Sequence, residues 1–506
     1  MMNVTRNLST HSDKQNATSI QLPLADVVRS SDPSDWRYIA EGAANLVVVH
    51  QPGLQRSHTS GDATGLECKA LRLRKRAVVD DRNEHHKESQ GSIAPEDPTL
   101  AEPVAMTRDA DAKLKAAQNE NLAFVGFQER VVAQLFKSQD VLQFTLVQLD
   151  ASWLQALNSA IHSSRPGAQH TRSEIDKTCP FGFVMEDLAG GLTESGGIVE
   201  MAFEIKPKWT FLPQSIESLK PDHRDIKSKY CRTCIYRTVR ATATSMEEEL
   251  NPYYTSKTRF CPLMLFGSSD LKTVRNSVGR LYCEWISAAT PDSLVQPTSS
   301  DDPRPSQLHN NFRVFRNGLV VKPGEIQLEE NTLDLLATGI HQSTGLKRLD
   351  ELQRRLDPID LDGIAGLLAS EPHGADLDRP IELTEFEALL PLITSQTSAT
   401  EYNASFEKLT TRQKAVLYMV SMTLKDCSVF IRIVKTLEQG GQEEELSSSP
   451  PAQPSRKVEI KMIDLDLKPL SRLKKYVTRD AEVLSHFKQL LQSTACPIPC
   501  VELPQP

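Results

Sequence analysis

The stretch KMIDLDLKPLSR at residues 461–472 places the tightest constraint on the fold, because a strand pattern gives way there to charged residues and a proline. Apolar side chains at alternate positions predict a strand over residues 458–463. The alternation continues into Asp464 and Asp466, so two carboxylates are expected where this strand ends. Two neighbouring carboxylates suit a hard divalent metal ion.

A helix is expected to follow, since Pro469 suits a first helical turn. Lys468, Arg472 and Tyr476 recur at intervals of four and would then share one helical face. A helix N-terminus flanked by cations attracts phosphate, and acids beside it could hold the metal for phosphoryl transfer. A charged surface turn between strand and helix explains the same spacing equally well.

Composition limits the classes of protein that fit. A chain of 506 residues is too long for a single hydrophobic core, so two or three folded units are expected. Its 39% hydrophobic and 25% charged residues are a normal balance for a globular protein. Apolar runs are too short for a membrane span, and the N-terminus lacks the apolar core of a signal peptide. Nine scattered cysteines favour reduced thiols inside a cell. The net charge of −8 disfavours bulk attraction to nucleic acid or membranes, so local basic clusters must bind any polyanion.

The N-terminal part contains two candidates for a phosphate-binding element. Residues 1–20 are polar and are expected to be disordered, after which residues 36–50 predict a hairpin with small residues at 42–44. Backbone amides of such a turn can cradle phosphates, although an ordinary turn is the commoner explanation. The predicted strand at 70–75 contributes Arg72, unless it is only a solvated basic edge.

The middle of the chain adds acids and cations. Residues 80–120 are rich in Asp, Glu, Lys, Pro and Ser and predict a loop insertion with little core. A strand at 183–188 carries Glu186 and Asp187 into a linker, where a capped turn is the alternative. Strand alternation projects Glu204, Lys206 and Lys208 in a common direction, and lysines aimed together near an acid indicate an anion.

A C-x-x-C motif follows at Cys231 and Cys234. It suggests zinc or redox chemistry, but the sequence shows no second pair at metal-binding spacing, and Cys261 and Cys283 stand isolated. A zinc-dependent nucleic-acid module is therefore disfavoured, and the neighbouring arginines are counted among the basic residues.

The C-terminal half predicts helices and a second strand pair. Residues 286–309 read as a linker, residues 310–318 as a strand closed by an Asn-Gly turn, and residues 327–396 as amphipathic helices. A buried helix is predicted over 410–422, after which Asp426 stands as a lone acid between apolar elements. Because a buried carboxylate is costly, a partner or a function must retain it.

These segments together resemble one family. The motifs are EGAANLV at 41–47, EIKPK at 204–208, NNFRVF at 310–315, KDCS at 425–428 and DLDLKP at 464–469. In this order, over residues 36–480, the chain resembles the inositol-pentakisphosphate 2-kinases, with low-complexity segments like those of a fungal-type member. The resemblance implies an α+β, two-lobed, kinase-like fold. It also implies transfer of the γ-phosphate of ATP, with Mg²⁺, to the 2-hydroxyl of inositol pentakisphosphate, giving inositol hexakisphosphate (phytate).

The resemblance also assigns roles to residues. Asp426 matches the catalytic base, Asp464 the magnesium ligand, and Lys206 a residue that meets the transferred phosphate. The residues expected around the nucleotide are Glu41, Gly42, Ala43, Ala44, Asn45, Arg72, Glu186, Asp187 and Glu204. The residues expected around the substrate phosphates are Lys206, Lys208, Arg240, Asn310, Arg313, Lys468, Arg472 and Tyr476.

The implied organisation is a nucleotide-binding lobe at 21–185, with a flexible insertion at 80–120, and a catalytic and inositol-phosphate-binding lobe at 186–495. Flexible insertions are expected at 286–309 and 436–457. We expect a monomer in the nucleus or cytoplasm. It is expected to act on a small molecule and to have no nucleic-acid or membrane partner. A catalytically inactive inositol-phosphate-binding protein is the alternative.

Two departures from the family pattern stand out. Plant and animal relatives hold a structural zinc through two histidines and two cysteines, but residues 320–410 contain His341, His373 and no cysteine, so no zinc is predicted there. The family also has a Trp-Arg pair after an Arg-Pro. Here Arg165-Pro is followed only by Arg172, which either replaces that guanidinium or leaves the contact unmade.

Overall fold

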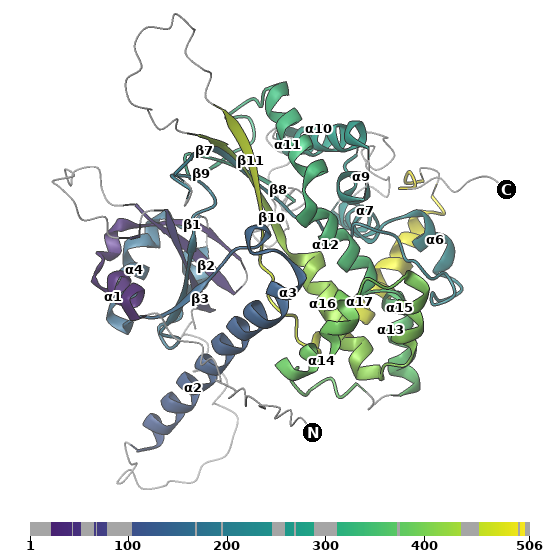
Figure 1. Cartoon of the computed structure of the whole chain (residues 1–506), viewed down its shortest axis with the longest axis horizontal. Coiled ribbons are helices and arrows are strands. Elements are labelled where there is room, and N and C mark those ends of the chain that lie inside the picture. The colour runs from purple at the N-terminus through teal and green to yellow at the C-terminus, as the bar shows by residue number, and fades with distance from the viewer. Residues whose placement is uncertain are drawn as a thin grey trace, which may run out of the picture.

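The computed structural model describes residues 22–42, 44–51, 65–66, 68–77, 104–166, 169–193, 196–244, 259–267, 270–287, 311–371, 375–436, 455–493 and 496–500. Two antiparallel sheets and a large set of helices make up these residues (Figure 1), so the α+β prediction is confirmed. The predicted lobe boundaries stay predictions. Among the segments predicted to be flexible or disordered, residues 1–20, 80–103, 288–309 and 437–454 lie outside the described residues.

The first sheet has the order β1-β2-β3-β6-β4, with β5 also paired to β3. Its strands are β1 (Trp36–Glu41), β2 (Asn45–His50), β3 (Lys69–Ala77), β4 (Thr145–Gln148), β5 (Ser173–Ile175) and β6 (Phe181–Glu186). The predicted hairpin at 36–50 is confirmed, because β1 and β2 pair antiparallel across residues 42–44. Helices α1 (Leu22–Ser30) and α4 (Ala151–Ile161) bury apolar side chains against this sheet.

The second sheet has the order β11-β10-β7-β8-β9. Its strands are β7 (Ile198–Ile205), β8 (Phe312–Arg316), β9 (Leu319–Val321), β10 (Ser428–Lys435) and β11 (Arg456–Ile463). β10 is buried along nearly its whole length, as expected for a central strand covered on both faces. The predicted Asn-Gly turn after β8 is present, with both Asn317 and Gly318 at positive φ.

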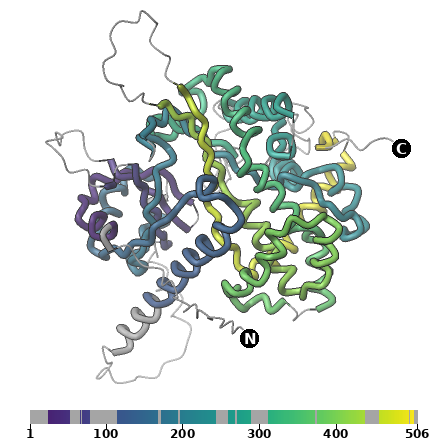
Figure 2. The backbone as a smooth tube through the Cα atoms, viewed as in Figure 1, coloured from purple at the N-terminus to yellow at the C-terminus, as the bar shows by residue number. Residues whose placement is uncertain are grey.

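The two faces of the second sheet have different neighbours. One face contributes Phe203 and Ile431 to the main hydrophobic core, which the helices of residues 262–426 complete. The opposite face contributes Ala202 and Phe430, which pack with Ile39 of β1 and other side chains of the first sheet. Figure 2 shows β10 and β11 in yellow-green, running between the purple and blue N-terminal strands and the green helices.

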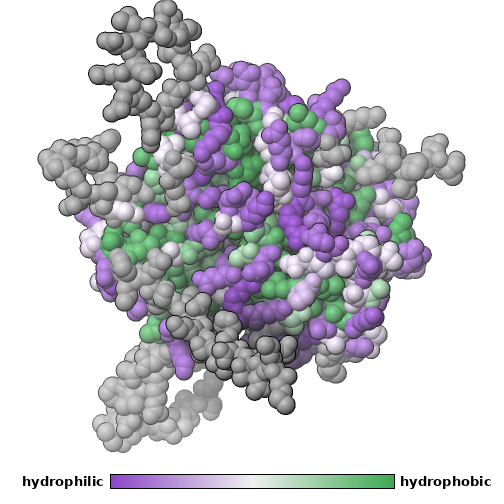
Figure 3. All heavy atoms as spheres, viewed as in Figure 1, coloured by the Kyte–Doolittle hydropathy of each residue, from purple (hydrophilic) through white to green (hydrophobic). Residues whose placement is uncertain are grey.

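Helices supply most of the rest of the chain. They are α6 (Arg224–Lys229), α7 (Arg232–Thr244), α9 (Pro262–Phe266), α10 (Leu271–Ser287), α11 (Glu330–Gln342), α12 (Thr344–Arg355), α13 (Asp360–Ser370), α14 (Leu383–Thr394), α15 (Ala399–Glu407), α16 (Thr411–Asp426) and α17 (Arg472–Leu490). The helices predicted within 327–396 are confirmed. No helix among the described residues is long and apolar enough to cross a membrane. On the face drawn in Figure 3, hydrophobic and hydrophilic residues are interspersed.

Three expectations about local structure are wrong. Residues 104–127 form the helix α2 (Val104–Phe127), where the sequence analysis had a loop up to 120. Alanine, lysine and glutamine favour a helix, and the end of α2 buries Val125 with Phe181 and Phe183. α16 continues to Asp426, four residues past its predicted end. α17 begins at Arg472, so Lys468 precedes the helix and shares no helical face with Arg472.

Candidate active site

A cavity of about 1030 Å³ lies where the two sheets meet. The first sheet, the end of α2, the second sheet and the segment after β11 all contribute to its wall. The charged residues in this wall are Glu41, Arg72, Arg74, Glu120, Glu186, Asp187, Glu204, Lys206, Arg313, Asp426, Asp464, Asp466, Lys468 and Arg472. The fold thus brings together most of the residues selected from the sequence.

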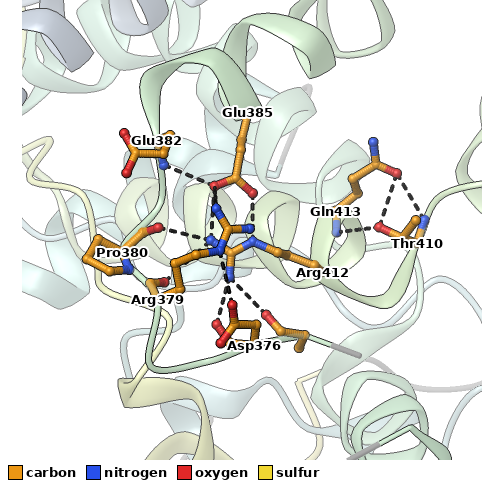
Figure 4. A network of polar contacts seen from close by, with 9 residues as sticks. Asp376, Arg379, Pro380, Glu382, Glu385, Thr410, Arg412 and Gln413 are labelled. Atoms are coloured by element: carbon orange, nitrogen blue, oxygen red, sulfur yellow. Dashed lines mark hydrogen bonds and ion pairs between the residues drawn. The ribbon is translucent and has the colours of Figure 1, made fainter. Parts of the chain in front are cut away.

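Asp426 is the last residue of α16, and the start of that helix is firmly anchored. The guanidinium of Arg412 donates to both carboxylate oxygens of Glu385 at 2.7 and 2.9 Å and to the carbonyls of Ala375 and Asp376 (Figure 4). Thr410 caps the same helix by accepting from the Gln413 amide. A helix held at its first turn and buried along its length presents its final carboxylate at a fixed place.

Two lysines hold the Asp426 carboxylate. Lys208 Nζ donates to Oδ1 at 3.1 Å, and Lys468 Nζ donates to Oδ2 at 2.8 Å. Burial alone would raise the pKa of Asp426, but these two ammonium groups outweigh it and leave the pKa below its ordinary value. The side chain of Asp426 remains 48% exposed, so it is paired, ionised and accessible from the cavity. The sequence indicates the acid, but the pairing of Asp426 with these two lysines appears only in the structure.

Asp464 lies just after β11, in the wall of the cavity. Its backbone has a φ of 58°, a left-handed conformation that is uncommon outside glycine and frequent at functional sites. Its Oδ2 is 3.2 Å from the Ser428 hydroxyl. Burial raises the pKa of Asp464, Lys206 and Arg72 oppose that rise, and the nearby carboxylates of Glu204 and Asp466 add to it. Three carboxylates, those of Asp464, Glu204 and Asp466, therefore lie close together here.

Ser428 connects Asp464 to the residues of β7. Its hydroxyl accepts from Lys206 Nζ at 2.7 Å and lies 2.8 Å from Oε1 of Glu204. The other oxygen of Glu204 accepts from Arg313 at 3.1 Å, through neighbouring strands β7 and β8. Glu204, Lys206 and Arg313 thus form one polar group beside Asp464. The sequence analysis selected these three residues and did not consider the serine.

Arg72 reaches the cavity from β3. It makes a bidentate pair with Asp466, at 3.1 Å from Nη1 to Oδ1 and 2.5 Å from Nη2 to Oδ2. Its guanidinium also lies over the Phe124 ring of α2, 5.4 Å from the centroid. The second acid predicted at the strand exit is therefore occupied by an arginine, whereas Asp464 has no comparable bidentate partner among the described residues.

The turn between β1 and β2 borders the cavity. The Gly42 amide donates to the Asn45 carbonyl at 2.9 Å, and Gly42 and Ala44 are exposed. Glu41 is buried, with Oε2 accepting from Lys75 at 2.9 Å and from Arg165 at 2.6 Å. Glu41 therefore supports the turn and is already engaged by two cations. Ala43 lies outside the described residues.

Glu186 is the last residue of β6 and Asp187 follows it; both lie at the cavity wall, and they differ in charge state. Burial raises the pKa of Glu186, but hydrogen bonds from Lys461 and Arg432 outweigh this and leave the pKa below its ordinary value. Burial raises the pKa of Asp187 to about 6, even though its carboxylate accepts from the Ala189 amide at 2.8 Å. Glu186 is thus a structural anion, and Asp187 is the acid of this pair that changes charge near neutral pH.

The predicted substrate cations divide into two groups. Lys206, Arg313, Lys468 and Arg472 line the cavity, and Lys208 reaches it through Asp426. Arg240 instead lines a separate surface depression between α7 and α17. Tyr476 is half-buried one turn beyond Arg472 and packs against the main core. Asn310 lies outside the described residues, and Arg172 is exposed in α5 (Gln169–Arg172), away from the cavity wall.

Known proteins match this chain over most of its length. The family model described as inositol-pentakisphosphate 2-kinase matches residues 38–482. An inositol-pentakisphosphate 2-kinase of Cryptococcus neoformans var. neoformans is 26% identical over 480 residues, covering 90% of this chain and 94% of the relative. Those of Arabidopsis thaliana and Danio rerio are 23% and 21% identical, covering 93% and 92% of this chain and 97% and 95% of the relatives.

Proposed function

The chain belongs to the inositol-pentakisphosphate 2-kinase family of phosphotransferases, and from that premise we propose that it transfers the γ-phosphate of ATP to the 2-hydroxyl of inositol 1,3,4,5,6-pentakisphosphate. The product is inositol hexakisphosphate. The observation that carries the proposal is the meeting of Asp426 and Asp464 in one cavity with Lys206 and Lys468. Phosphoryl transfer needs a carboxylate that accepts the hydroxyl proton, a carboxylate that binds a metal ion, and cations that stabilise the phosphate.

The first-sheet side of the cavity is the proposed nucleotide site. Aromatic and apolar side chains of α2 and β6, among them Phe124 and Met185, offer a surface for the adenine ring. The exposed backbone at Gly42 leaves room for phosphates to approach the turn, and a Cβ there would meet nothing within 4 Å. Asp187, which lines the same part of the cavity, would accept a hydrogen bond from the nucleoside.

The chemistry of the donor set fits magnesium at Asp464. A buried carboxylate whose pKa is raised, with Glu204 and Asp466 nearby, would be stabilised by a divalent cation. Carboxylates bind magnesium through one or two oxygens and leave other positions to water and phosphate. When bound at Asp464, magnesium would supply positive charge that offsets the negative charge of the phosphate being transferred.

The remaining groups divide the reaction between them. Asp426 would accept the proton of the 2-hydroxyl as the hydroxyl oxygen attacks the γ-phosphorus of ATP. The bond between the γ-phosphorus and the oxygen that leaves with ADP then breaks. Lys206, whose Nζ is 2.7 Å from the Ser428 hydroxyl beside Asp464, would stabilise charge on the phosphate in transfer. Lys208 and Lys468, which hold Asp426 here, would exchange that carboxylate for substrate phosphates and so release the base.

Incubation of the purified protein with ATP, magnesium and each inositol phosphate isomer, followed by separation of the products, tests the proposal. Conversion of the 1,3,4,5,6-pentakisphosphate to the hexakisphosphate is expected. Binding of the pentakisphosphate without any product would instead favour the inactive binding protein. Residence in the nucleus or cytoplasm is proposed on the family resemblance alone and is checked by imaging a tagged chain.

A further inference from the structure

Four cysteines from three distant parts of the chain meet away from the active site. Cys231 and Cys234 stand at the start of α7, Cys261 precedes α9, and Cys500 lies in the C-terminal segment. Their sulfur atoms all lie within 4.8 Å of one another. The sequence argument that this C-x-x-C lacks a second ligand pair is therefore wrong, because folding supplies Cys261 and Cys500.

The distances suit one metal ion. Tetrahedral zinc, with bonds of about 2.3 Å to each sulfur, separates its thiolates by roughly 3.8 Å. The Cys231 and Cys261 sulfurs are 3.7 Å apart, too far for a disulfide bond, and all four thiols are free. An iron–sulfur cluster distributes its ligands over more than one iron and needs a wider set of sulfurs.

The surroundings suit thiolates. The Cys231 amide donates to the Cys500 sulfur and the Cys234 amide to the Cys231 sulfur, both at 3.4 Å. The buried Arg259 places Nη2 3.7 Å from the Cys500 sulfur and also donates to the Ile498 carbonyl. Backbone amides and a guanidinium directed at sulfur compensate the charge of a tetrathiolate site.

We propose that Cys231, Cys234, Cys261 and Cys500 bind a single zinc ion in a closed structural site. Four thiols lose their protons when Zn²⁺ binds, which gives a complex of net charge −2 that Arg259 partly neutralises. No ligand position remains open for catalysis, so the ion would serve the fold. The site lies outside residues 320–410, where the family's histidine and cysteine zinc ligands are expected.

The ion would fasten the C-terminal segment to α7. Two hydrogen bonds already hold this segment at the end of α6, directly before α7: the Cys500 amide donates to the Lys229 carbonyl at 2.9 Å, and the Tyr230 hydroxyl donates to the Pro497 carbonyl at 3.1 Å. The same region packs against α17 through Tyr230 and Phe487, whose rings are 4.9 Å apart. Because α17 begins with Arg472, the zinc site would stabilise a helix that borders the active-site cavity.

The test measures metal in the purified wild-type chain by elemental analysis, without any activity assay. We expect one zinc per chain, retained through dialysis and lost when a strong chelator is combined with a thiol reagent. Cys500→Ser should hold far less zinc and unfold at a lower temperature. Cys496→Ser is the matched control, because this exposed cysteine of the same segment lies outside the cluster and should leave the zinc content unchanged.

Cobalt replacement gives a second readout that does not depend on the variants folding. Wild-type protein loaded with Co²⁺ should show the sulfur-to-cobalt absorption and the intense visible bands of tetrahedral thiolate coordination. Metal-free wild-type protein, with four reactive thiols and no cobalt spectrum, would overturn the proposal. So would disulfide bonds among these cysteines, detected by mass spectrometry, or equal zinc loss in both serine variants.

Discussion

Lys468 donates a hydrogen bond from Nζ to Oδ2 of Asp426 at 2.8 Å, which joins the segment after β11 to the last residue of α16. Lys208 binds the other oxygen of the same carboxylate. A base held by two cations is kept ionised but is also a weak proton acceptor. A polyanionic substrate that attracts both lysines would relieve this, so substrate binding and activation of the base are coupled in this site.

Asp426→Asn should lower turnover by roughly 10²- to 10⁴-fold, the usual contribution of a positioned general base. The amide has the same size but cannot accept the hydroxyl proton. Binding of inositol pentakisphosphate should persist or tighten, because a negative charge near the phosphates is removed. Turnover measured beside calorimetric binding checks this, and loss of binding in a folded variant would indicate a structural role.

Lys468→Met should move the acidic limb of the pH–rate profile to higher pH. Lys468 is one of the two cations that lower the pKa of Asp426, so its removal lets that pKa rise. The base then becomes protonated, and inactive, at a higher pH than in the wild type. The measurement is kcat/KM for inositol pentakisphosphate across pH, with Lys475→Met, on the exposed surface of α17, as the control. An unchanged limb would mean that another group sets it.

Asp464→Asn should lower turnover by at least ~10²-fold, by analogy with other groups that stabilise transition-state charge. The variant should need more magnesium for half-maximal activity, since one charged oxygen ligand is lost. Thermal unfolding should not worsen, because burial disfavours the carboxylate that is replaced. Asp378→Asn, at an exposed acid that is not part of the cavity wall, is the control. Near-normal turnover would remove Asp464 from the metal site.

Asp187 should make wild-type stability fall as pH rises through weakly acidic values. Its pKa is raised from 3.8 to about 6 in the folded chain, so the folded state holds the proton more tightly than the unfolded state does. Relative to Asp187→Asn, the wild type should therefore lose stability between about pH 4 and 6, by at most ~3 kcal/mol. Denaturant unfolding of both proteins across this range gives the difference, and parallel curves would contradict the prediction.

Arg165→Met should destabilise the fold by roughly 3 kcal/mol, since it removes one partner of a buried ion pair. The side chains of Arg165 and Glu41 are only 1% and 2% exposed. Without Arg165, the buried Glu41 carboxylate would retain only its ion pair with Lys75. Arg172→Met, at an exposed position, should change stability little. Denaturant unfolding compares them. An equal effect of the two changes would contradict this division of roles.

Sequence reasoning succeeded where chemistry and local pattern coincide. The β1–β2 hairpin and the β11 strand were predicted because their alternation is set by neighbouring residues, and Asp464 follows from the end of that strand. The partners of Asp426 were missed because Lys208 and Lys468 approach it from separate segments. The zinc candidate was missed for the same reason, since Cys500 is 269 residues from Cys231.

Two errors have local causes. A loop was predicted up to residue 120 because the segment is polar. The residues of α2 favour a helix, however, and its apolar end is buried, so a helix forms there. Lys468 was placed on a helix because Pro469 suits a first turn, but the chain stays irregular until Arg472. In each case the residue or segment still lies at the cavity wall, although its secondary structure was predicted wrongly.

Arg313→Ala and Arg472→Ala should each raise the KM for inositol pentakisphosphate by about one to two decades and leave the KM for ATP nearly unchanged. Each variant loses a charge-assisted contact to phosphate, worth roughly 1.5 to 3 kcal/mol. Both arginines line the cavity, from β8 and from the start of α17. Because the ligand is a dense polyanion, wild-type affinity should also fall as salt rises.

Arg240→Ala separates the geometry from the family resemblance, which places Arg240 among the substrate contacts. Arg240 lines a depression between α7 and α17, outside the cavity that holds Asp426. Its replacement should therefore leave the KM for inositol pentakisphosphate within a few fold of wild type, measured under the same conditions as for Arg472→Ala. A KM raised as far by Arg240→Ala would show that the substrate reaches beyond the cavity. If Arg313→Ala and Arg472→Ala instead raised the KM for ATP and left the KM for inositol pentakisphosphate unchanged, the two arginines would belong to the nucleotide site.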